Sequence, residues 1–195
     1  MIAYIDGKLT EKTPTYVVID CNGVGYHIQI SLHTYEQIGG NERLKLLTQQ
    51  IIKEDSHTLY GFATEEEREL FNLLISVSGV GTNTARLMLS SLKPIDIRNA
   101  ISAANWALIK TVKGIGEKTA QKIVIDLKNK IQKSDVSGSV SFVSGGTVSK
   151  TEEALSALLM LGFNKNEAEK GLTKIRQQFP DLSVEELVKQ TLKIL

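Results

Sequence analysis

The stretches VSGVGTNTA, residues 77–85, and VKGIGEKTA, residues 112–120, repeat one pattern at an offset of 35 residues. Each contains a valine, then two glycines on either side of an apolar residue, and finally a Thr-Ala pair. Apolar residues before and after each stretch keep the same offset, which predicts that each copy is a helix, a short turn and a second helix. One Gly-x-Gly turn is common, whereas two copies in a single frame indicate a built repeat.

The glycine turns are predicted to bind phosphate. Glycine permits a sharp turn and lets backbone N–H groups come close to a ligand. The second helix of each copy begins at its turn, so its free N–H groups and the positive end of its dipole face the loop. The apolar residue between the glycines is expected to point inward. The predicted phosphate-binding residues are Gly79, Val80, Gly81, Asn83 and Thr84 in the first copy, and Gly114, Ile115, Gly116, Lys118, Thr119 and Lys122 in the second.

Charge distinguishes the two copies. Ser78, Asn83 and Leu87 of the first copy correspond to lysines at 113, 118 and 122 in the second. The whole chain has a formal charge of only +1, so the positive charge is local. Contacts from backbone and lysine to phosphate give affinity without reading base sequence, and no base-reading element is apparent. We therefore infer recognition of DNA by shape. The alternative is a helical hairpin that is repeated for packing alone.

The segment before the repeat predicts a small barrel in residues 1–63. Polar and apolar residues alternate from Thr15 to Cys21 and again from Tyr26 to Ile30, and Asn22-Gly23 between them is a hairpin signal. With further runs at residues 2–9, 43–53 and 58–63, about five short strands are expected. That number suits a five-stranded antiparallel barrel of the OB-fold type. After it, Thr64 and Glu67 predict a capping box, and helical spacing is expected throughout residues 64–132.

The remainder of the chain predicts a tether and a small helical domain. Residues 133–147 contain five Ser and three Gly, so residues 133–148 are predicted to be a flexible linker. Residues 149–195 predict three short helices, at 151–161, at 166–179 before Pro180, and from about Ser183 onward. The predicted class is thus a multidomain α and β protein.

Composition excludes several classes of protein. No apolar run approaches the ~20 residues of a membrane helix, and the N-terminal residues lack the features of a signal peptide. The single cysteine, Cys21, forms no internal disulfide, which favours a reducing, cytoplasmic setting. The three histidines lack metal-ligand spacing, and no GxxxxGK[ST] loop is present, so no metal or cofactor is predicted.

The paired motifs resemble tandem helix-hairpin-helix DNA-binding motifs. Following a barrel that opens MIAYIDGKL and contains GVGY at 23–26 and LYGF at 59–62, they resemble the RuvA family of Holliday-junction branch-migration proteins over the whole chain. The resemblance implies a homotetramer that holds a four-way junction open and flat in recombination, DNA repair and the SOS response. Whether two tetramers form an octamer around the DNA stays open.

The resemblance also implies partners and further sites. Glu54 and Asp55 match an acidic pin on a barrel hairpin, where repulsion of phosphate would guide separated strands. The C-terminal domain resembles ubiquitin-associated-like domains and is implied to recruit RuvB, an AAA+ motor that supplies the ATPase, so that the chain itself is not an enzyme. Candidate motor contacts are Leu158, Leu161, Gly162 and Phe163. A junction resolvase is a further implied partner.

Two other functions share features with this sequence. A helix-hairpin-helix DNA glycosylase/lyase would use Lys118 in GIGEKTA as the nucleophile, but it needs an aspartate about eighteen residues downstream, and Asp135 falls in the predicted tether. An OB-fold that binds single strands is less favoured because residues 1–63 contain 5 basic and 7 acidic residues, whereas single-strand grooves are usually basic.

Overall fold

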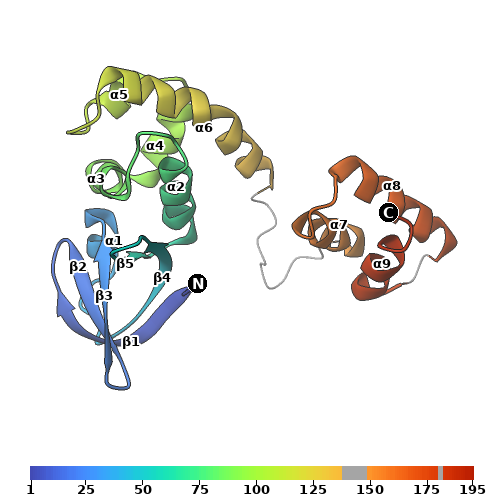
Figure 1. Cartoon of the computed structure of the whole chain (residues 1–195), viewed down its shortest axis with the longest axis horizontal. Coiled ribbons are helices and arrows are strands. Elements are labelled where there is room, and N and C mark those ends of the chain that lie inside the picture. Colours follow the sequence, from blue (N-terminus) through green and yellow to red (C-terminus); the bar gives the residue numbers. More distant parts are fainter. Residues whose placement is uncertain (138–148, 180–181) are drawn as a thin grey trace. The chain divides into compact units, whose positions relative to one another are not determined.

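The computed structural model describes residues 1–137, 149–179 and 182–195 (Figure 1). The chain divides into two compact units, Met1–Ser139 and Val140–Leu195. The first unit contains all five strands of the described chain together with the glycine-turn repeat. Its last helix continues to Ser137, into the segment predicted as a linker, and residues 138–148 of that prediction lie outside the described residues.

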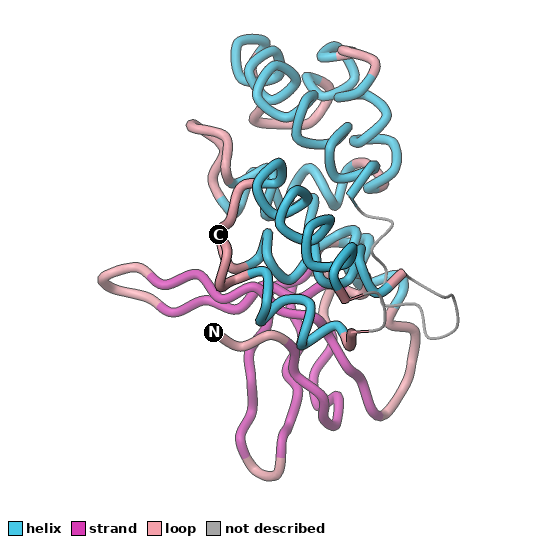
Figure 2. The backbone as a smooth tube through the Cα atoms, turned by 90° about the vertical axis from the view of Figure 1, so that its right-hand side faces the viewer, coloured by secondary structure: helices cyan, strands magenta, loops and turns pink. Residues whose placement is uncertain are grey.

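The N-terminal strands close into the predicted five-stranded barrel. The strand order is β1-β2-β3-β5-β4, and the neighbours are antiparallel as predicted except for β3 and β5, whose parallel pairing corrects the expectation of a wholly antiparallel barrel. Figure 2 shows the strands grouped together, with hairpin loops that extend beyond them. Asn22 and Gly23 both have positive φ, of 55° and 92°, which confirms the predicted tight turn. The strands are β1 (Tyr4–Lys12), β2 (Tyr16–Cys21), β3 (Val24–Ile30), β4 (Arg43–Ile52) and β5 (His57–Phe62).

A short helix, α1 (Leu32–Gln37), lies between β3 and β4 and was not predicted from the sequence. Ser31 caps it by accepting a hydrogen bond from the backbone N–H of Thr34. A helix of six residues is too short to show a helical period in the sequence, so the cap was its only local signal.

The two glycine turns each join a pair of helices, as predicted. α2 and α3 flank the first turn, α5 and α6 flank the second, and α4 connects the pairs. All five helices share one apolar core, which includes Phe71 of α2, Met88 of α3 and Ile123 of α6. The helices are α2 (Glu65–Ile75), α3 (Thr82–Ser91), α4 (Pro94–Ser102), α5 (Trp106–Lys110) and α6 (Glu117–Ser137).

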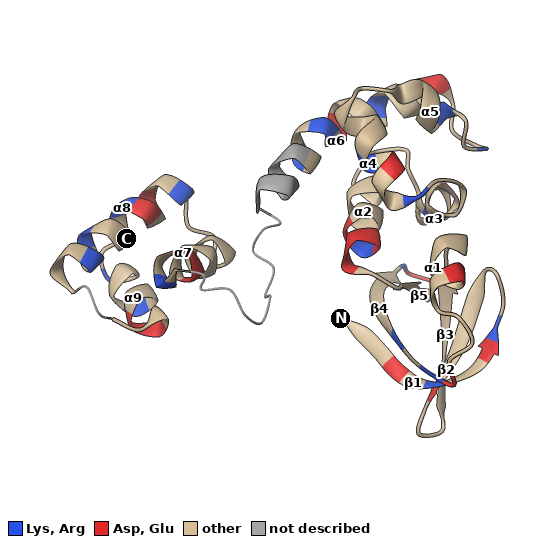
Figure 3. Cartoon of the chain, turned by 180° about the vertical axis from the view of Figure 1, so that it is seen from behind, with Lys and Arg blue, Asp and Glu red and all other residues tan. Residues whose placement is uncertain are grey.

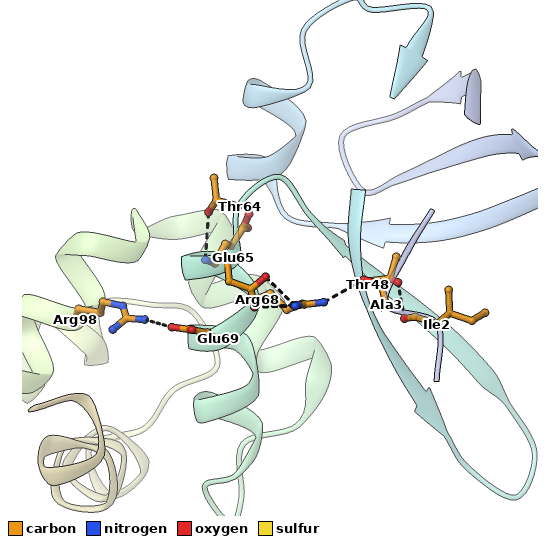
Figure 4. A network of polar contacts seen from close by, with 9 residues as sticks. Ile2, Ala3, Thr48, Thr64, Glu65, Arg68, Glu69 and Arg98 are labelled. Atoms are coloured by element: carbon orange, nitrogen blue, oxygen red, sulfur yellow. Dashed lines mark hydrogen bonds and ion pairs between the residues drawn. The ribbon is translucent and has the colours of Figure 1, made fainter. Parts of the chain in front are cut away.

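The same core extends into the barrel, so the barrel and the repeat are packed as one body. Tyr60 and Phe62 of β5 each place their ring 5.0 Å from the ring of Phe71. In Figure 4, Arg68 of α2 reaches the barrel, where its guanidinium donates to the carbonyl of Ala3 at 3.0 Å. Such shared burial fixes the orientation of the repeat on the barrel.

The predicted capping box at the start of α2 forms only in part. Thr64 accepts from the backbone N–H of Glu67 as expected, at 3.3 Å. The carboxyl group of Glu67 does not return to the cap, because it is completely buried and accepts hydrogen bonds from the hydroxyls of Ser31 and Thr34. Glu67 therefore connects α2 to α1 and the barrel, a long-range role that the local S/T-x-x-E pattern cannot reveal.

The second unit is a three-helix domain, as predicted. Its helices are α7 (Lys150–Met160), α8 (Lys165–Gln178) and α9 (Val184–Thr191). Complete capping boxes begin α7, at Ser149 and Glu152, and α9, at Ser183 and Glu186. Gly171 is tolerated inside α8 because the helix packs closely there: a Cβ at this position would lie 2.7 Å from Cγ2 of Thr191.

Candidate nucleic-acid interface

The first glycine of each pair makes the turn between the helices. Gly79 has a φ of 94° and Gly114 a φ of 88°, a region that residues with a Cβ rarely adopt. The next residue closes each turn, since Val80 N–H donates to the Val77 carbonyl at 3.0 Å and Ile115 N–H to the Val112 carbonyl at 3.1 Å. Val80 and Ile115 are buried, as the sequence predicted for the apolar residue of each turn.

The second glycine of each pair is not required by the fold. Gly81 has an ordinary extended conformation, with φ −84° and ψ 169°, and Gly116 is also outside the positive-φ region. A Cβ built on either residue meets no atom within 4 Å. The turn itself therefore needs only the first glycine of each pair. The second glycine leaves bare backbone facing open space.

The helix that follows each second glycine presents its N-terminus at that open space. Gly81 is the N-cap of α3 and has no side chain to accept from the first N–H groups, and the first turn of α3 contains no acidic residue. Ala85 N–H donates to the Gly81 carbonyl, and Ala120 N–H to the Gly116 carbonyl, both at 2.9 Å, so the two helices start in the same way. The N–H groups of the residues that precede Ala85 and Ala120 in each helix have no acceptor within the helix. They point outward along the helix axis, at the positive end of the dipole.

The predicted cationic side chains gather at the second turn. Lys113, Lys118 and Lys122 are exposed, and within the described residues none of them forms an ion pair. Figure 3 shows basic segments in α5, in the loop after it and at the start of α6, with acidic colour beside them. At the first turn, Asn83 is exposed and Thr84 partly buried, and Thr119 at the second turn is also partly buried.

Sequence reasoning missed the residue that follows each second glycine. Thr82 opens α3, and its hydroxyl accepts a hydrogen bond from the Tyr60 hydroxyl of β5 at 2.9 Å. Glu117 opens α6 at the equivalent place, and its carboxylate lies 2.9 Å from Nζ of Lys110 in α5. The offset of 35 residues pairs these two positions, so the repeat contained the signal, but their partners are visible only in three dimensions.

The two candidate pin residues lie at the β4–β5 turn. Glu54 and Asp55 are exposed there, and Lys53 N–H closes the turn on the Ser56 carbonyl at 2.8 Å. Ser56 donates to the Asp55 carboxylate at 3.3 Å, an ordinary turn contact. The geometry thus places two neighbouring carboxylates on a protruding, solvated turn.

The candidate motor contacts divide between core and surface. Leu158 is completely buried in the core of the second unit, so its side chain is unavailable to a partner and its place among the candidates is wrong. Leu161 is 60% exposed, Gly162 turns the chain with a φ of 94°, and Phe163 packs partly against the core. Met160, which was not a candidate, is 81% exposed beside Leu161.

One argument against the lyase alternative also fails. Residue 135 lies within α6 and not in a tether, so its position does not exclude the alternative.

Within the described residues, no cluster of His, Cys, Asp or Glu is suited to hold a metal ion. None of the helices in the described parts of the chain is both long and apolar enough to cross a membrane.

Comparisons with known proteins cover the chain from end to end. Residues 1–61 match the family described as RuvA N terminal domain, residues 71–129 the SAM-like helix-hairpin-helix tandem, and residues 149–195 the RuvA C-terminal domain. A protein of Flavobacterium psychrophilum named Holliday junction branch migration complex subunit RuvA is 55% identical over 195 residues, with all of both chains covered. Proteins of the same name from Christiangramia forsetii and Bacteroides thetaiotaomicron are 53% and 48% identical, again over the full length of both chains. These matches do not favour the glycosylase/lyase alternative, and they establish that the chain belongs to the RuvA family.

Proposed function

We propose that this protein binds four-way DNA junctions through phosphate contacts from its two glycine turns, as the junction-binding subunit of a branch migration complex. The observation that carries the proposal is the open space above Gly81 and Gly116, where the fold itself imposes no need for glycine. A glycine whose Cβ would meet nothing inside the protein leaves room for a ligand to come close to the backbone from outside. The names of the full-length relatives agree with a junction as that ligand.

The chemistry of the turns suits the phosphate backbone. N–H groups at the start of α3 and α6 donate to phosphate oxygens, and a hydrogen bond to an ionised acceptor is roughly twice as strong as a neutral one. Lys118 and Lys122 add counter-charge at the second turn, and Asn83 and Thr84 add neutral donors at the first. Because these contacts reach only phosphate, specificity comes from where several turns are held relative to one another.

Rigid packing of the turns on the barrel supports such a geometric specificity. The Phe71 contacts with β5 and the Tyr60–Thr82 hydrogen bond join the first turn to the barrel. A homotetramer would repeat this arrangement four times around an axis and so match the four arms of an open, planar junction. Glu54 and Asp55 would then place eight carboxylates near the crossover, where they repel phosphate and keep strands apart.

The second unit is proposed to recruit the motor. The chain contains no GxxxxGK[ST] loop, so we place ATP hydrolysis in an AAA+ partner of the RuvB type. The exposed apolar residues at the end of α7, Met160 and Leu161, are the surface best suited to receive that partner. A cytoplasmic location and contact with a junction resolvase complete the proposal.

The test compares DNA shapes. Fluorescence anisotropy would measure the affinity of the full chain for a four-way junction and for a linear duplex of equal length, and light scattering would give the mass in solution. We expect tetramers that prefer the junction by at least tenfold at moderate salt. A monomer that binds the two DNAs equally would refute the proposal.

A further inference from the structure

The residue that opens the second helix differs in charge between the two turns. Thr82 is neutral and accepts a hydrogen bond from buried Tyr60. Glu117 is an exposed carboxylate at the equivalent place, directly after Gly116. An acidic residue stabilises a helix N-terminus when nothing else is bound there. At this turn the acidic residue also follows directly after Gly116, whose exposed backbone we assign to a phosphate.

The ion pair and the hydrogen bond of Glu117 are too weak to neutralise the charge of its carboxylate. Its carboxylate pairs with Lys110 at 2.9 Å, but the side chains are 50% and 48% exposed, respectively. Gln121 donates to the same carboxylate at 3.4 Å. An ion pair this open to water neutralises its members only in part, so Glu117 still repels a neighbouring anion.

The cations around the second turn would otherwise make it a strong phosphate site. Lys118 follows Glu117 directly, and Lys113 and Lys122 lie on either side of it in the sequence. The first turn has no such lysines and no acid in the first helical turn either. The acid and the three lysines thus occur together at one turn of the repeat, whereas the equivalent positions of the other turn are Ser78, Thr82, Asn83 and Leu87.

We propose that Glu117 lowers the affinity of the second turn for phosphate, and that Lys110 limits this effect by pairing with Glu117. The inference rests on the proposed function, because it assumes that the second turn holds DNA. Three lysines then attract the DNA backbone while one carboxylate keeps each contact reversible. Reversible contacts suit a surface past which DNA must move.

The test is the Glu117→Gln variant, with Asp126→Asn as the matched control. Asp126 is an exposed acid on the same helix, about 13 Å further along its axis, so its replacement changes the net charge equally but away from the turn. We expect Glu117→Gln to bind a four-way junction about threefold more tightly at 50 mM salt, the effect of removing a unit charge roughly 7 Å from a phosphate in water. Asp126→Asn should bind as the wild type does. The gain should shrink at 300 mM salt because an exposed charge is screened there.

A second variant at residue 117 controls for any effect of glutamine on the stability of the first turn of α6. Glu117→Thr installs the residue type of the first turn and should also bind more tightly than Asp126→Asn. Equal or weaker binding by both Glu117 variants would overturn the inference, as would a gain that persists unchanged at high salt. Wild-type protein that shows no preference for the junction over a duplex would instead refute the proposed function.

Discussion

Replacing the second glycine of a turn by alanine should separate DNA binding from stability. Gly81 already has a φ that alanine adopts, and a methyl group there meets nothing within 4 Å. Gly81→Ala should therefore leave the fold intact and keep the free energy of unfolding within about 1 kcal/mol of the wild type, because the lower freedom of alanine in the unfolded chain offsets its poorer N-cap at the start of α3. Gly116→Ala should behave in the same way.

The same methyl group projects to where a phosphate must come to reach the N–H groups of α3 or α6. Loss of one hydrogen bond to a charged acceptor costs about 1.5–3 kcal/mol. That corresponds to roughly a tenfold or greater loss of affinity for each contact. Each variant should thus unfold within about 1 kcal/mol of the wild type and bind a junction at least tenfold more weakly.

The control is Gly79→Ala in the same turn. Its φ of 94° should cost alanine about 1–2 kcal/mol of stability, so that any loss of binding comes with a loss of folding. Urea denaturation would measure stability, and fluorescence anisotropy with a labelled junction would measure binding. Wild-type affinity in both Gly81→Ala and Gly116→Ala would refute the idea that DNA comes close to these residues.

Four further outcomes are expected. Lys118→Ala and Lys122→Ala should each weaken binding similarly for junctions of different base sequence and lower the slope of log affinity against log salt by about 1, as measured by anisotropy at several salt concentrations. Glu67→Ala should lower the free energy of unfolding by about 3 kcal/mol in urea, since it leaves two buried hydroxyls without their acceptor. Tyr60→Phe should weaken junction binding more than duplex binding, because it removes the hydrogen bond that holds the first turn on the barrel; equal losses for both DNAs would contradict this. Deletion of residues 149–195 should leave junction binding unchanged and abolish motor-driven branch migration, and a deletion that destroys binding would show that the division of roles is wrong.

Local signals were sufficient for most of the fold. Alternation in the first sixty residues predicted the barrel strands, Asn22-Gly23 predicted their tight turn, and the repeat predicted two helical hairpins. These features depend on neighbours within a few residues, so they can be seen in one sequence. Helix α1 was missed because a single short turn of helix has no period of its own.

Long-range contacts account for the features that the sequence could not reveal. Glu67 fits a capping box locally, yet its carboxyl group is held by Ser31 and Thr34, more than thirty positions earlier in the chain. Leu158 has the same character in the sequence as Leu161, and only the packing of three helices buries the first and exposes the second.

The sequence was sufficient to predict the residues of the candidate site, but not which of them form the turn and which face the ligand. Both glycines of each pair stood out, but only the φ angles assign the turn to Gly79 and Gly114 and leave Gly81 and Gly116 for a ligand. The partners of Thr82 and Glu117 come from other elements, so their influence on the two turns required the structure.

Amide hydrogen exchange tests the central claim most directly. With mass-spectrometric readout, exchange would be compared for the full chain alone and with a saturating four-way junction. If backbone N–H groups bind phosphate, the residues around 79–84 and 114–119 should become protected by the junction, while residues 149–179 stay unchanged. A junction that binds tightly without slowing exchange in either turn would contradict the claim.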